Sequence, residues 1–299
     1  MDSKTMSAAA AAVLLLAALT ACQPLPLLCS SGPATAAGSP AAAPTATVSP
    51  ASTEAPASGA AAARQTATPA PYQAPKVVSF TRAADLDGDG VLEKVEEGRY
   101  PIEGNQQGDT FLNVYKGEKV FRYDFGVAEP RSFPENVELV DVDGDALPEI
   151  LIFRDLGSGM GTGLVLKFRD DAFACIFDTR TVRPDIRVTY APNYTLLVRS
   201  ETMKPKRREF PLQADERFAG TGVYDDKGRL INPYQGFIAR PIEMHSVAPE
   251  GKGPSDIVVQ QDCSGIGGHA DGLGMVYTTY RYHSAGWRVV STDFEFVGR

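Results

Sequence analysis

The chain has 299 residues, which allows one large domain or two small ones. Its 29 basic and 37 acidic side chains give a net charge of −8, and residues 76–299 carry all of this excess with 27 basic and 35 acidic residues. This acidity argues against a nucleic-acid binder and against adsorption onto anionic lipid. The 22 Pro and 28 Gly argue against an all-helical bundle.

The N-terminal segment has the features of an export signal. Residues 7–21 are uncharged and mostly apolar, a stretch too short to cross a bilayer but of the length found in signal peptides. The run ends in Leu19-Thr20-Ala21-Cys22, which resembles the lipobox of bacterial lipoproteins. That resemblance implies a signal peptide at residues 1–21, acyl chains on Cys22, and a lipid-anchored protein of the bacterial cell envelope, on the outer surface or in the periplasm. An ordinary secretory peptide with a chance Cys is the alternative.

Residues 22–75 are predicted to form a disordered tether behind the lipidated Cys22. In residues 30–75, Ala, Pro, Ser and Thr fill 37 of 46 positions, and Val48 and Tyr72 are the only large apolar or aromatic side chains. Such a composition buries too little surface to offset the entropy of ordering. The tether would hold the folded part away from the lipid surface.

The remaining residues, 76–299, are predicted to be all-β. Short segments rich in β-branched and aromatic residues are separated by turn residues, and long stretches with helical periodicity are absent. Four hairpin-like pieces have turns centred on Gly117, Asp171, Lys227 and Ala285, at nearly equal intervals along the chain. This regular spacing predicts a β-propeller-like array of about four repeats of roughly 56 residues. A β-sandwich with evenly spaced hairpins is the alternative.

Two acidic loops occupy matching places in the repeat. Residues 85–93 (loop 1) and 141–149 (loop 2) both read D-x-D-G-D-x-x-x-E, and their first aspartates lie one repeat length apart. Carboxylates this crowded repel one another unless a cation lies among them, and Ca²⁺ takes six to eight oxygen ligands in a flexible shell. The ligands expected at two structural Ca²⁺ sites are Asp85, Asp87, Asp89, the Val91 carbonyl and Glu93 in loop 1, and Asp141, Asp143, Asp145, the Leu147 carbonyl and Glu149 in loop 2.

The EF-hand is the rival interpretation of these loops. Loop 1 continues with an EF-hand-like Gly90 and Glu96, but loop 2 has Ala146 and Ile152 at those positions. The segment DVDGDALPEILIF at residues 141–153 resembles instead the FG-GAP (VCBS-like) repeat of integrin α-chain N-terminal propellers and bacterial secreted proteins. This resemblance implies calcium loops between strands of a propeller. The third and fourth repeats lack the acidic pattern, so two sites are expected rather than four.

The sequence offers little material for catalysis. A Gly-rich segment at residues 264–274 contains His269 and Asp271, which would form an acid/base pair if the protein were an envelope hydrolase. We expect instead a non-enzymatic binding module, held at the membrane by its lipid, whose partner is a protein or glycan of the envelope and not a nucleic acid. A purely structural envelope protein is a third alternative. Cys175 and Cys263 are either a disulfide of an exported domain or two buried thiols.

Overall fold

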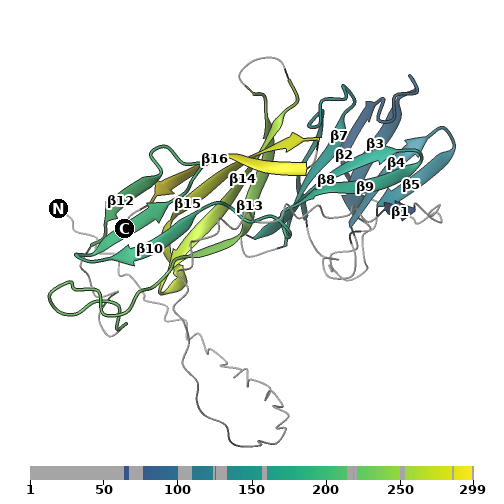
Figure 1. Ribbon diagram of the computed structural model, residues 1–299. Coiled ribbons are helices and arrows are strands. Elements are labelled where there is room, and N and C mark those ends of the chain that lie inside the picture. The colour runs from purple at the N-terminus through teal and green to yellow at the C-terminus, as the bar shows by residue number, and fades with distance from the viewer. Residues whose placement is uncertain are drawn as a thin grey trace, which may run out of the picture. The chain divides into compact units, whose positions relative to one another are not determined.

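The computed structural model describes residues 64–66, 77–99, 110–123, 125, 133–156, 160–213, 218, 221–249, 253–284 and 286–297 (Figure 1). The predicted signal peptide at residues 1–21 and the predicted lipidation site Cys22 lie outside these residues. So does the predicted tether, except for Arg64–Thr66. None of the described residues belongs to a helix able to cross a membrane.

The described part of the chain is all-β, as predicted, with four antiparallel sheets and no α-helix. Sheet 1 consists of β2 (Val77–Ala84), β3 (Glu93–Arg99), β4 (Thr110–Lys116) and β5 (Lys119–Tyr123). Sheet 2 consists of β6 (Phe133–Val140), β7 (Glu149–Asp155), β8 (Gly161–Arg169) and β9 (Ala172–Asp178), with β1 (Arg64–Thr66) added beside β9. Apart from β1, each of these sheets is therefore built from strands that follow one another along the chain.

The C-terminal half forms two more sheets. Sheet 3 consists of β10 (Arg187–Ala191), β11 (Thr195–Arg199) and β12 (Arg207–Pro211). Sheet 4 consists of β13 (Phe237–Val247), β14 (Asp256–Gly265), β15 (Gly268–His283) and β16 (Gly286–Phe296). The strands of sheet 4 have 10 to 16 residues and are the longest in the structure's described part.

Three of the four predicted hairpins are found as strand pairs, one each in sheets 1, 2 and 4. Sheets 1 and 2 begin at Val77 and Phe133, one repeat length apart. The predicted turns at Gly117 and Asp171 join β4 to β5 and β8 to β9, and Ala285 lies outside the described residues, between the paired His283 and Gly286. The predicted third hairpin, residues 221–231, is wrong as a pair of strands, because only the bridge between Tyr224 and Leu230 forms there. Sheet 3 lies upstream of that segment.

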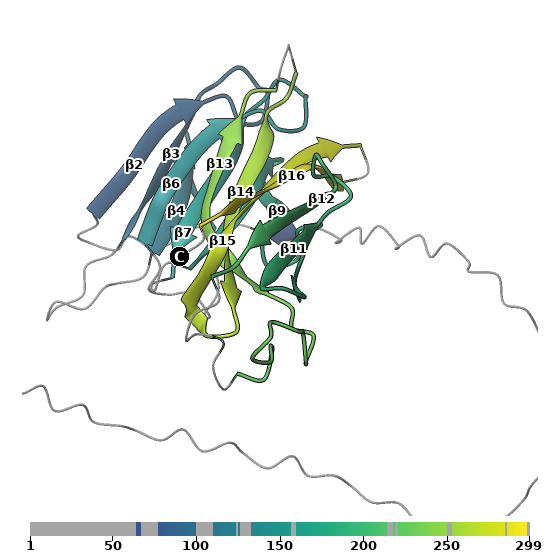
Figure 2. The same cartoon turned by 90° about the vertical axis from the view of Figure 1, so that its left-hand side faces the viewer.

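Three apolar cores show which sheets face one another. Because side chains alternate along a strand, β7 of sheet 2 directs Ile150 and Ile152 into a core shared with sheet 1, and Leu151 and Phe153 into a core shared with sheet 4. Sheet 4 shares a further core with sheet 3. The sheets thus pack in the order 1-2-4-3 (Figure 2), and they do not close into a ring.

One face of sheet 4 covers two neighbours. On β14, Ile257 and Val259 pack in the core with sheet 2, whereas Cys263, on the same face, packs in the core with sheet 3. Gln261 lies on this face between the two groups. We call this the seam, defined as the part of sheet 4 around Gln261 where one core gives way to the other.

The two cysteines of the β-sheets are free thiols. Cys175 packs against the core of sheets 1 and 2, and Cys263 is buried in the core of sheets 3 and 4, so the disulfide alternative is wrong. Burial raises the pKa of Cys175 to about 11 and that of Cys263 to about 12. Both thiols are therefore protonated at neutral pH.

Candidate metal centre

Loop 1 connects β2 to β3, and its own carboxylates organise its backbone. Asp85 accepts hydrogen bonds from the backbone N–H groups of Gly88 (2.7 Å) and Gly90 (2.9 Å). Asp89 accepts one from Val91 (2.8 Å), and Glu93, at the start of β3, accepts one from Leu86 (2.8 Å). Short polar side chains bond to nearby backbone in this way in tight turns, so the loop has a defined shape.

Loop 2 connects β6 to β7 and repeats the same bonds. Asp141 accepts hydrogen bonds from Gly144 (2.7 Å) and Ala146 (3.1 Å), Asp145 accepts one from Leu147 (2.9 Å), and Glu149 accepts one from Val142 (3.1 Å). The glycine at the fourth position has a left-handed backbone in both loops, with φ of 81° at Gly88 and 84° at Gly144, which explains the glycine there. The two loops are therefore one structural unit that occurs twice.

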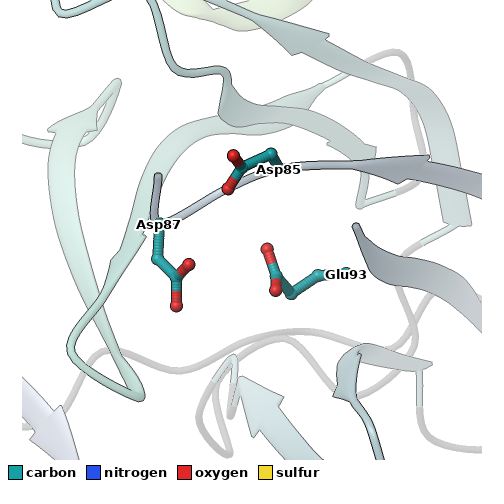
Figure 3. A group of neighbouring side chains, drawn as sticks. All are labelled: Asp85, Asp87 and Glu93. Atoms are coloured by element: carbon teal, nitrogen blue, oxygen red, sulfur yellow. The ribbon is translucent and has the colours of Figure 1, made fainter. Parts of the chain in front are cut away.

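The carboxylates of each loop converge, as Figure 3 shows for Asp85, Asp87 and Glu93. In loop 1 these three residues each present an oxygen within 4.8 Å of the others, and Asp141, Asp143 and Glu149 do so in loop 2. The structure thus brings together three of the four predicted carboxylate ligands of each loop. Asp89 and Asp145 lie outside these groups of three. The expected carbonyl ligands, at Val91 and Leu147, stay a prediction.

A lysine from a neighbouring strand enters each loop, and sequence analysis missed both. Lys116, at the end of β4, forms ion pairs with Asp87 and with Asp89, the latter at 2.8 Å. Lys167 of β8 pairs with Asp143, with Asp145 at 2.8 Å and with Glu149 at 3.7 Å. The strand register places both lysines across from the last acid of the loop, since Lys94 pairs with Tyr115 and Ile150 with Leu166. Only the pairing of strands could have identified them.

The two loops differ in one further cation. Arg169 of β8 donates from Nη2 to Asp145 (3.1 Å) and Glu149 (3.3 Å) in loop 2, and its Nη1 donates to the backbone carbonyl of Leu86 in loop 1. The residue two positions after Lys116 is Glu118, so loop 1 has no matching arginine. Arg169 therefore joins the two loops and adds positive charge to loop 2.

Sheet 4 has an acid at the matching strand start, although the acidic loop pattern is missing before it. Asp256 starts β14 as Glu149 starts β7, and Arg281 of β15 lies across from it, one residue beyond the pair of Ile257 and Tyr280. The two side chains form a bidentate ion pair, with both nitrogen–oxygen distances at 2.7 Å. Sheet 4 thus has an acid paired with a cross-strand base at this position, but the segment before Asp256 lacks the aspartates of loops 1 and 2.

The last acid of each loop is buried, and burial disfavours its charged form. Glu93 and Glu149 are both 0% exposed. Burial raises the pKa of Glu93 and brings that of Glu149 to about 7. Hydrogen bonds from Lys116 lower the pKa of Asp89; although burial opposes the shift, Lys167 and Arg169 lower that of Asp145 to about 2.

One oxygen in loop 1 has its bonding capacity unused. Oε2 of Glu93 accepts from Leu86, but the buried Oε1 has no hydrogen-bond partner among the described residues. A buried carboxylate oxygen in this state is costly unless a cation or donor reaches it. The matching Oε1 of Glu149 lies beside Lys167 and Arg169. The donor set, made of carboxylate oxygens alone, fits a hard divalent cation.

The flanking elements decide against the EF-hand. Loops 1 and 2 each connect two antiparallel strands, β2 to β3 and β6 to β7, whereas an EF-hand loop lies between two helices.

The Gly-rich segment with His269 and Asp271 belongs to the β14–β15 hairpin. Gly265 pairs with Gly268, and β15 begins at that residue. Asp271 is buried, accepts a hydrogen bond from the Tyr190 hydroxyl (3.4 Å) of sheet 3, and accepts another from the backbone of Gly267 (3.4 Å). These contacts hold the hairpin against sheet 3. The side chain of His269 lies outside the described part of the structure.

Comparison with known proteins adds one finding. Residues 184–295 match the YybI C-terminal domain family, so sheets 3 and 4 are similar to that domain, and the acidic loops lie upstream of it. No curated protein and no solved structure matches the chain.

Proposed function

We propose that this protein is a lipid-anchored lipoprotein of the bacterial cell envelope whose β-sheet region is stabilised by two Ca²⁺ ions and serves as a binding module. The duplicated loop carries the metal part of the proposal: two loops at equivalent places in successive sheets share every turn hydrogen bond described above and converge three carboxylates each. The unpartnered Oε1 of Glu93 is a second, independent indication of a cation. Sheets 1 and 2 would then be consecutive blade-like FG-GAP repeats within a propeller-like array.

The charges of the loops favour a divalent ion over the lysines alone. Loop 1 has four carboxylates facing one ammonium group, that of Lys116. Loop 2 has four facing Lys167 and Arg169. Both loops keep an excess of negative charge, which attracts a cation. Ca²⁺ suits them better than Mg²⁺ because the loops offer several carboxylates without the octahedral geometry that Mg²⁺ demands. The ion would neutralise and order the loops rather than take part in a reaction.

Thermal unfolding with Ca²⁺ and with a chelator tests the metal proposal. An ion that binds only the native state stabilises it by about 2.7 kcal/mol at a hundredfold excess over Kd. For a domain of this size that raises Tm by roughly 5–10 °C. The double variant Asp87→Asn/Asp143→Asn should lose the shift, whereas Asp226→Asn, in an exposed turn, should keep it. An equal Tm in Ca²⁺ and chelator for the unaltered protein would refute the sites.

Anchoring is tested separately. The unaltered protein should partition into the detergent phase after expression in a bacterial host, because two or three acyl chains hold a protein at a membrane. The variant Cys22→Ser carries no acyl chain and should move to the aqueous phase. Equal partitioning of the two proteins would refute the lipid on Cys22.

A further inference from the structure

A cavity of about 600 Å³ lies at the seam, away from the acidic loops. Gly161 and Thr179 of the sheet 2 region form one wall, the segment that leads into β10 forms another, and the start of β13 closes the third. Gln261 reaches it from β14. Cavities of about 300–1,000 Å³ hold small organic ligands, so its size is in that range.

The cavity exists because one face of sheet 4 covers two neighbours. Ile257 and Val259 belong to one core and Cys263 to the other, and Gln261 lies between them. The Gln261 side chain is largely buried, and its Nε2 donates to the carbonyl of Ala239 (2.8 Å), another cavity residue. A polar side chain therefore occupies the place where the apolar contacts stop.

The charged side chains that line the cavity are all arginines: Arg180, Arg183 and Arg240. The protein as a whole is acidic, with a net charge of −8, so this local sign is opposite to the average. Arg180 forms a bidentate ion pair with Asp178, at 2.7 and 2.9 Å. Arg183 and Arg240 are exposed, and neither has an ion pair with a carboxylate in the part of the chain that the structure describes.

Apolar side chains complete the lining. Phe237 is 57% exposed, which is a large exposure for a phenylalanine, and Pro184, Ile186 and Ile238 lie around the same cavity. Guanidinium groups pair with carboxylates, phosphates and sulfonates in a planar, two-point geometry, while the exposed part of Phe237 adds apolar surface. The lining thus combines anion recognition with an apolar contact.

We propose that this cavity binds a small organic anion, a molecule in which a carboxylate, phosphate or sulfonate group is joined to a ring or short aliphatic part. Arg183 and Arg240 hold the anionic group, and Phe237 packs against the apolar part. The proposal rests on the binding-module part of the proposed function, and it names the ligand class and its site. It does not depend on calcium.

The test uses two fluorescent probes that differ only in the anionic group. Anilinonaphthalene sulfonate has a phenyl ring, a naphthalene ring system and a sulfonate, and phenyl-naphthylamine is the same molecule without the sulfonate. We expect saturable, one-to-one binding of the sulfonate probe to the full chain, and at least about tenfold weaker binding of the neutral one, the loss of about one charge-assisted contact. The double variant Arg183→Ala/Arg240→Ala should weaken the sulfonate probe by a similar factor and leave the neutral probe unchanged.

Matched controls separate the cavity from general surface binding. Arg288→Ala removes an exposed arginine from the edge strand β16 and should leave the affinity unaltered. Phe237→Ala should weaken both probes. Equal affinity of the two probes, or a sulfonate affinity that Arg183→Ala/Arg240→Ala leaves unchanged, would overturn the proposal. Melting curves confirm that each variant is folded.

The metal proposal and the cavity proposal can be refuted independently of each other. The loop variant Asp87→Asn/Asp143→Asn should bind the sulfonate probe as the unaltered protein does. If calcium gives no stabilisation while the arginine variants lose the probe, the metal sites are refuted and the cavity stands; the converse pair of results refutes the cavity alone.

Discussion

Loop 1 should bind Ca²⁺ more tightly than loop 2, because Arg169 pairs with two carboxylates of loop 2 but contacts loop 1 at a backbone carbonyl. Its guanidinium lies 3.1 Å from Asp145 and 3.3 Å from Glu149. An ion bound to those oxygens at about 2.4 Å would lie roughly 4–5 Å from the guanidinium. A charge of +2 facing +1 at that separation costs about 2 kcal/mol even in the dielectric of water. Should Arg169 move away instead, its hydrogen bonds to both loops are lost.

An energy of about 2 kcal/mol corresponds to a factor of about 30 in Kd. Calorimetric titration isolates each loop: Asp143→Asn leaves loop 1 and Asp87→Asn leaves loop 2. We expect the second variant to bind about thirtyfold more weakly than the first. Adding Arg169→Met to Asp87→Asn should recover most of the difference, whereas Lys119→Met, which removes an exposed cation paired with Asp171 outside the loops, should recover none.

Two results would refute this reasoning. Equal affinities of loops 1 and 2 would show that Arg169 does not act on the ion. A difference that persists after Arg169→Met would assign it to another feature of the loops.

Two further predictions concern stability. Burial raises the pKa of the fully buried Glu97 to about 7, against the opposing effects of Ser79 and Arg154, so its protonation stabilises the fold. That contribution is complete below about pH 4.5 and is lost as the pH rises to about 7, about 3 kcal/mol in all. In saturating Ca²⁺, Glu97→Gln should flatten the dependence of the urea midpoint on pH, and an unchanged slope would contradict the assignment. Gly144→Ala should cost about 1 kcal/mol, since its Cβ would lie 3.6 Å from Pro254 and only the left-handed backbone is strained. Gly161→Ala places a Cβ in steric overlap with the Phe153 ring and should cost several times more in the same urea titration; equal costs would show that the packing there yields.

Local sequence determined the strands and the loops of this protein. The alternation and β-branched content of segments such as Glu149–Asp155 are enough to specify strands, because every second side chain of a strand meets the same face. The acidic loops could equally be predicted from the sequence. Gly88 and Gly144 are needed where the backbone is left-handed, and the aspartates bond to backbone a few residues away, so the spacing of the motif contains most of the loop geometry.

The third predicted hairpin shows a limit of prediction from local sequence patterns. Residues 221–231 have the turn residues of a hairpin, yet only one bridge forms, and Val223 and Tyr224 are buried in the core of sheets 3 and 4. Side-chain burial in a core built by distant strands outweighed a local preference for pairing.

Tertiary structure alone decided which residues act together. Lys116 and Lys167 reach the acidic loops only because strand register places them across from Glu93 and Glu149, and register depends on residues far apart in the chain. The packing order 1-2-4-3 follows from the length of sheet 4, one face of which covers both sheet 2 and sheet 3. The arginine cavity is a product of that order. Its lining comes from four separate stretches of the chain, and no pattern within any of them indicates that they meet.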